Sequence, residues 1–104
     1  MTTESKQQTD IDSFLLYLER EKRMSPHTVS SYRRDLKQLI LFCEEFELHH
    51  WRSIKSSHIR QFIAQLHRNG LAGRSIQRLL SAIRSLYRFL IREDLADNNP
   101  AQAV

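Results

Sequence analysis

The stretch from Arg74 to Arg92, RSIQRLLSAIRSLYRFLIR, constrains the fold of this chain more than any other. Its apolar residues recur at steps of three, four and one, which places them on one side of an α-helix. They are Ile76, Leu79, Leu80, Ile83, Leu86, Tyr87 and Leu90. The pattern predicts a long amphipathic helix in which Leu86 and Tyr87 are buried and Arg84 and Arg88 are exposed.

The opposite side of this helix carries arginines and small hydroxyl side chains. The stripe consists of Arg74, Arg78, Ser81, Ser85, Arg88 and Arg92, flanked by Gln77 and Arg84. A helix face that is merely solvated usually mixes charge signs, because acid–base pairs one turn apart stabilise it. Here no acid occurs before Glu93, so five arginines repel one another. That arrangement favours an external polyanion, and nucleic acid is the first candidate.

The charge of the whole chain is distributed unevenly. Its net charge is +4, with 16 basic and 12 acidic residues. Nine of the twelve acids lie at or before Glu47, and the other three are Glu93, Asp94 and Asp97. From Leu48 to Arg92 there is no acid, so this half produces a positive field that steers an anionic partner.

The remaining sequence predicts three more helices. The first is capped by Thr9 or Asp10 and runs to about Lys22, with a mixed-charge, solvated polar side. The second begins at Ser25-Pro26, a hydroxyl cap followed by proline at the first helical position. The third begins at Ser56 or Ser57 and ends at Asn69-Gly70. With only two glycines and two prolines in 104 residues, the fold class expected is all-α, a four-helix bundle.

These signals divide the chain into three parts. Residues 1–8 are expected to be a disordered tail, residues 9–95 the helical domain, and residues 96–104 the start of a linker. The first turns of the second helix carry His27, Ser30, Ser31 and Arg34 on the side away from its apolar stripe. Free N–H groups and a partial positive charge at a helix start bind phosphate, so this segment is a second candidate anion site.

Other kinds of chemistry find little support. The five histidines lack the paired spacing of a zinc site, and Cys43 lies within an apolar stripe as a core residue. Tyr32 and Tyr87 also fall on apolar faces. No catalytic motif stands out, no apolar run is long enough for a membrane span, and there is no signal peptide. We therefore expect a cytoplasmic protein with no metal, cofactor, small-molecule ligand or membrane partner.

Two motifs resemble the N-terminal domain of tyrosine recombinases. The first is S-P-x-T-x-x-x-Y-x-x-D-L, here Ser25, Pro26, Thr28, Tyr32, Asp35 and Leu36. The second is S-I-x-R-x-L-S-A-I-R-S-L-Y-x-F-L, from Ser75 to Leu90, followed by Asn99-Pro100. The closing N-P-A-x-x-V is similar to the Xer branch, nearer to XerC than to XerD. The resemblance covers about residues 11–104.

The resemblance implies a SAM-like core-binding domain that forms one half of a C-shaped clamp on duplex DNA at a recombination half-site. In such a domain the second and fourth helices lie against the major groove. These are the two helices singled out above. The DNA-binding residues that this implies are His27, Thr28, Ser31, Arg34, Arg74, Gln77, Arg78, Ser81, Arg84 and Arg88.

The resemblance also implies a longer parent enzyme. Its catalytic arginines, lysine, histidines and nucleophilic tyrosine belong to a C-terminal domain absent from this sequence, so the fragment alone is not expected to be an enzyme. A Xer-type parent resolves chromosome dimers through a phosphotyrosine intermediate, in a tetramer with a second, XerD-like recombinase. Two alternatives stay open: a helix-turn-helix transcription regulator, which expects a shorter recognition helix, and a helical module that binds an acidic protein.

Overall fold

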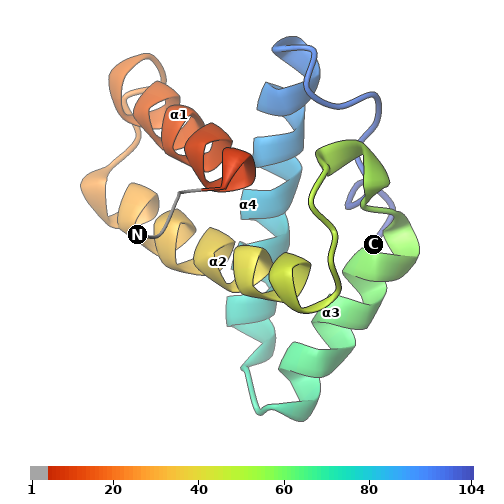
Figure 1. The fold of residues 1–104 in the computed structure, drawn as a ribbon. Helices are drawn as coiled ribbons and strands as arrows, with labels where there is room; N and C mark the ends of the chain where they lie inside the picture. The colour runs from red at the N-terminus through yellow and green to blue at the C-terminus, as the bar shows by residue number, and fades with distance from the viewer. Residues whose placement is uncertain (1–4) are drawn as a thin grey trace, which may run out of the picture.

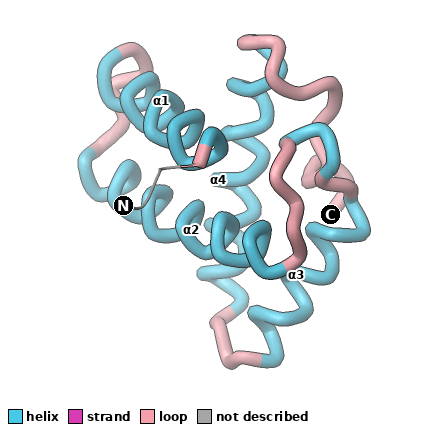
Figure 2. Tube along the Cα trace, in the orientation of Figure 1, coloured by secondary structure: helices cyan, strands magenta, loops and turns pink. Residues whose placement is uncertain are grey.

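The computed structural model describes residues 5–104, and residues 1–4 lie outside the described part. Four α-helices follow one another along the chain (Figure 1). They are α1 (Lys6–Arg20), α2 (Pro26–Glu45), α3 (Ser56–Arg68) and α4 (Gly73–Arg92), with a short 3₁₀ helix, η1 (Trp51–Ser53), before α3. Between residues 5 and 104 only helices and loops occur, so the all-α prediction is confirmed (Figure 2).

Local sequence signals explain two of the helix ends. The hydroxyl of Ser25 accepts a hydrogen bond from the Thr28 N–H at 3.2 Å, and Pro26 is the first residue of α2, as predicted. Gly70 ends α3 with a φ of 88°, a left-handed conformation that costs glycine little. The N–H of Leu71 then closes the turn on the carbonyl of Leu66 at 3.0 Å.

Two helix starts differ from the prediction. α1 begins earlier, because the Ser5 hydroxyl accepts from the Gln8 N–H at 3.1 Å. Residues 5–8 are therefore a cap and a helical turn rather than the end of a tail; the rest of the predicted tail lies outside the described residues. Ser56 is the first residue of α3 rather than its cap, and its hydroxyl donates to the Pro100 carbonyl at 2.9 Å.

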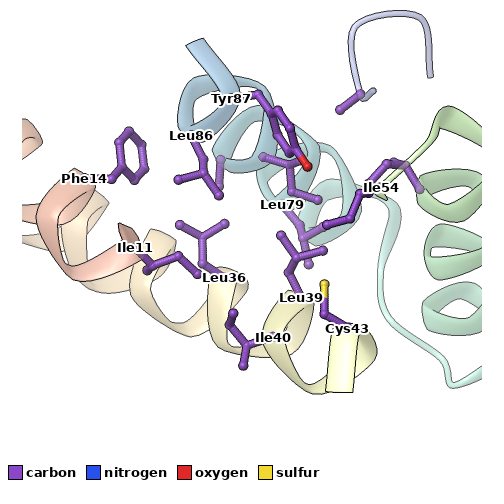
Figure 3. Close-up of a cluster of buried hydrophobic side chains, with 14 of the residues drawn as sticks. Ile11, Phe14, Leu36, Leu39, Ile40, Cys43, Ile54, Leu79, Leu86 and Tyr87 are labelled. Carbon is purple, nitrogen blue, oxygen red and sulfur yellow. The ribbon is translucent and has the colours of Figure 1, made fainter. Parts of the chain in front are cut away.

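The helix α4 is the centre of the packing. It packs against α1, α2 and α3, and α1 also packs against α2. In Figure 1, α1 and α2 form one pair that crosses α4, while α3 runs beside α4 in the opposite direction. All seven apolar residues predicted for α4 are buried, and Ala82 and Phe89 join them. The core between these helices also contains Phe14, Leu36 and Leu39 (Figure 3).

Polar contacts inside the core fix the connection between α2 and α3. The Tyr87 hydroxyl donates to the Trp51 carbonyl at 2.8 Å, and the Trp51 indole N–H donates to the Asp10 carboxylate at 2.9 Å. The two rings meet edge to face at 6.0 Å. Cys43 is fully buried in the same core, as predicted. Burial, and then the nearby Glu44 carboxylate, raise the pKa of its thiol to about 12.

Packing continues beyond the predicted domain end at residue 95. Ala96 and Ala101 are buried in the core, so residues 96–104 lie against the helices instead of extending away. The Arg84 guanidinium donates to the carbonyls of Ala101 at 3.0 Å and Val104 at 2.6 Å. The Asn99 side chain donates in turn to the Arg84 carbonyl at 3.2 Å. This segment is thus attached to α4 by side-chain hydrogen bonds.

Candidate nucleic-acid interface

The start of α2 and the middle of α4 meet at a shallow hollow of about 320 Å³, which we call the α2–α4 hollow. Its lining consists of His27, Thr28, Ser31, Tyr32, Arg78 and Ser81. Five of these six residues were predicted as DNA contacts from their separate helices, and the structure brings them together. No acidic side chain lines the hollow. Its surface presents hydroxyl groups, an imidazole and a guanidinium, all of which bind phosphate oxygens.

Arg78 has an acidic partner that the pattern of its own helix does not show. Its Nε and Nη2 donate to the two carboxylate oxygens of Asp35 on α2, at 2.9 and 2.8 Å. These hydrogen bonds raise the pKa of Arg78 above its ordinary value. The Asp35 side chain is 7 % exposed and that of Arg78 is 43 % exposed. Arg78 therefore joins α4 to α2 while part of it still faces solvent.

Arg84 also differs from the prediction. We expected it to be exposed on the polar face, but it is partly buried. Its guanidinium is occupied by the C-terminal carbonyls of Ala101 and Val104. The prediction of an exposed Arg84 is wrong, because its partners come from a segment that was expected to leave the domain. Arg88 is exposed, and Leu86 and Tyr87 are buried, as predicted.

The other predicted contacts are exposed but more scattered. Arg74 and Gln77 are exposed in the first turns of α4 and line neither the α2–α4 hollow nor the larger groove described below. Arg34 is exposed on α2, and its Nη2 lies 3.4 Å from the Ser31 hydroxyl. Arg34 faces a different hollow, shared with Asp35 and Arg78 and with the turn after α3.

A larger groove of about 670 Å³ lies between α1, the α1–α2 turn and α4, and we call it the α1–α4 groove. Sequence reasoning missed its α1 side, Tyr17 and Lys22. Lys22 follows Glu19, Arg20 and Glu21, and such a mixed-charge run is typical of a solvated surface. Only the fold places Lys22 opposite the arginines of α4. Within residues 5–104 no three His, Cys, Asp or Glu side chains gather as a metal site.

The fold and this helix pair define a known class of domain. Residues 11–94 match the phage integrase N-terminal SAM-like domain, and the chain belongs to that family. Similar curated proteins are each named tyrosine recombinase XerC. One from Pseudomonas fluorescens Pf-5 is 40 % identical over 93 % of this chain and 33 % of its own length. One from Pseudomonas putida KT2440 is 42 % identical over 90 % of this chain and 31 % of its own length.

The chain spans about a third of the length of these relatives. A third relative, from Stutzerimonas stutzeri A1501, is 39 % identical over 90 % of the chain and carries the same name. No solved structure matches the chain significantly. Among the described residues, none of the helices is both long and apolar enough to cross a bilayer.

Proposed function

We propose that this chain is the DNA-binding domain of a tyrosine recombinase and holds duplex DNA against the first turns of α2 and the polar side of α4. The observation that carries the proposal is the α2–α4 hollow. α2 and α4, which are joined by the Asp35–Arg78 pair 43 residues apart in the sequence, both contribute phosphate-binding groups to this hollow. No acidic side chain lines it. A surface that bound an acidic protein segment would share this chemistry, so the test must separate the two partners.

The geometry of α4 suits a DNA groove. Its 20 residues span about 30 Å at 1.5 Å per residue. The major groove of B-DNA is about 12 Å wide and admits an α-helix. Arg74 and Gln77 are exposed side chains that hydrogen-bond base edges well, whereas Ser31 and Arg88 suit phosphate oxygens. The proposed contacts are therefore the ten residues predicted above, with Arg78 and Arg84 also holding the domain together.

The proposal extends to the longer protein that the relatives represent. We propose that it is a Xer-type recombinase of the cytoplasm, whose catalytic domain closes the clamp from the other side of the duplex. It would cleave DNA through a phosphotyrosine intermediate and act in a tetramer with a second, XerD-like subunit. The support is the shared name of relatives of which this chain covers about a third.

The test is fluorescence anisotropy of a labelled recombination half-site titrated with the chain at low salt. Arg74→Glu and Arg88→Glu should each weaken binding about tenfold, which corresponds to about 1.4 kcal/mol. Both residues are exposed, and within residues 5–104 neither makes an ion pair or a side-chain hydrogen bond. Arg60→Glu is the matched control, because Arg60 is equally exposed but lies on α3, outside the two helices proposed to face the duplex.

Two results would overturn the proposal. One is equal binding by the parent, both α4 variants and the α3 control, which would mean that α4 does not face the duplex. The other is efficient displacement of the labelled duplex by an acidic peptide at matched charge concentration but not by unlabelled duplex. That result would favour a protein-interaction module instead.

A further inference from the structure

The polar side chains that line the α1–α4 groove are all cationic or carry a hydroxyl, and no carboxylate lies among them. α4 contributes Ser81, Arg84, Ser85, Arg88 and Arg92, the α1 side contributes Tyr17 and Lys22, and Leu18, Met24, Tyr32 and Phe89 complete the lining. At 1.5 Å per residue, Ser81 and Arg92 lie about 16 Å apart along α4. The groove is therefore long enough for an extended anion rather than a single small ion.

Arg92 is held in place before any ligand arrives. Its guanidinium carbon lies 4.3 Å from the centre of the Tyr17 ring, and its Nη1 donates to the Tyr17 hydroxyl at 3.1 Å. The Phe89 ring lies 5.7 Å away. Aromatic faces attract a guanidinium and leave several of its donors free. An arginine fixed in this way loses less side-chain entropy when it binds an anion.

Lys22 lies by the same ring, with its Nζ 6.0 Å from the Tyr17 centre. The turn that carries it is held by two backbone hydrogen bonds, from Lys22 N–H to the Tyr17 carbonyl and from Met24 N–H to the Leu18 carbonyl. Between them Arg23 takes a φ of 51°, a left-handed conformation that persists only where its surroundings enforce it. Within residues 5–104 no ion pair involves Lys22, Arg88 or Arg92.

From this arrangement we infer that the α1–α4 groove binds the phosphodiester backbone of one DNA strand, with Lys22 and Arg92 as phosphate contacts outside the predicted set. The inference rests on the proposed function and extends it from α2 and α4 to the α1–α2 turn. Cations gathered without acids repel one another, and a phosphate between them removes that repulsion. The hydroxyls of Ser81 and Ser85 add donors to its oxygens. Tyr17 is a positioning residue that holds Arg92 toward the strand.

The experiment measures the salt dependence of duplex binding for Lys22→Gln and Arg92→Gln. Removing one cation that neutralises a phosphate should reduce the slope of log K against log salt by about 0.9. Arg20→Gln is the control, because Arg20 is exposed in the last turn of α1, carries the same charge and does not line the groove. It should leave the slope unchanged. Tyr17→Phe keeps the ring and removes the hydroxyl, so it should weaken binding less than Arg92→Gln.

Circular-dichroism melts identify any variant that unfolds. Lys22→Gln should perturb folding least, because Lys22 lies in a solvent-exposed turn. If Lys22→Gln has the same slope as Arg20→Gln while Arg74→Glu still weakens binding, the groove does not hold a DNA strand and the proposed function stands. If Arg74→Glu and Arg88→Glu also bind like the parent, the proposed function fails as well.

Discussion

The guanidinium of Arg78 binds both carboxylate oxygens of Asp35, at 2.9 and 2.8 Å, across the contact between α4 and α2. The geometry is bidentate, which only arginine among the basic side chains provides. Asp35 lies in the core side of the interface, whereas the far side of Arg78 is open to solvent. The Asp35–Arg78 ion pair thus lies within the surface proposed to bind DNA and holds its two helices together.

Removing Arg78 should cost stability. Arg78→Ala leaves the Asp35 carboxylate buried without its partner, and we expect a loss of about 1–3 kcal/mol, the usual cost of stranding such a group. Arg78→Glu should cost more, because it places a second negative charge beside Asp35. Urea unfolding measures both, with Arg88→Ala as the control at an exposed site of the same helix. Equal unfolding midpoints for Arg78→Ala and Arg88→Ala would mean that the pair adds nothing.

The core side of α4 should be far more sensitive than its surface. Leu86 is completely buried, so Leu86→Ala leaves a cavity and should destabilise the fold by about 2–5 kcal/mol. Arg88→Ala, two residues later, should stay within about 0.5 kcal/mol of the parent. Thermal melts of the two variants provide the comparison. A Leu86→Ala melting temperature close to that of Arg88→Ala would contradict this packing.

Cys43 should be inert and should make stability depend on alkaline pH. Its folded pKa is raised from 9.0 to about 12, so the folded state keeps the proton longer than the unfolded state. This contribution is complete below pH 9 and is lost as the pH rises towards 12. Urea unfolding between pH 8 and 10 should show a declining free energy of unfolding, with a shallower decline in Cys43→Ala. Thiol reagents should label the parent only on unfolding; rapid labelling of the native chain would contradict the burial.

No tyrosine in this chain should attack DNA. Tyr87 is buried with its hydroxyl on the Trp51 carbonyl, and its pKa is raised, first by burial, so that it remains protonated. Tyr17 already accepts from Arg92. A nicked suicide duplex carrying a recombination half-site should therefore yield no covalent adduct on a denaturing gel. An adduct that disappears in Tyr17→Phe, Tyr32→Phe or Tyr87→Phe would contradict this expectation.

The core was predictable because its signal is local. The spacing of apolar residues in α4 fixes which side is buried, and Ser25-Pro26 and Gly70 set helix ends within a few residues of themselves. The start of α1 was misplaced because Asp10, a plausible cap, serves instead as the acceptor for Trp51, 41 residues away. A contact between residues so far apart in the sequence cannot be predicted from the local pattern of residue types.

The candidate interface was predictable only in part for the same reason. The apolar and polar stripes of α4 correctly separated its buried side from the side away from the core, but three of its five arginines have partners elsewhere in the chain. Arg78 binds Asp35, Arg84 binds the C-terminal carbonyls, and Arg92 binds Tyr17, 75 residues earlier. The absence of acids on α4 therefore overstated how many of its arginines lack a partner within the chain. Arg92 keeps donors for an anion beside Tyr17, whereas Arg74 and Arg88 make no ion pair or side-chain hydrogen bond among residues 5–104.

The hydrogen bonds of residues 96–104 imply a separate opening event in the native state. The carbonyls of Pro100, Ala101 and Val104 are satisfied by side chains of Ser56 and Arg84 instead of by a helix or sheet ladder. Opening of this segment breaks these side-chain hydrogen bonds and exposes Ala96 and Ala101, while α1 to α4 stay folded. The amide protons of residues 96–104 should exchange with solvent together and sooner than those of α4. The orientation of this segment relative to the helices should vary only while the Arg84 side chain is detached from the Ala101 and Val104 carbonyls.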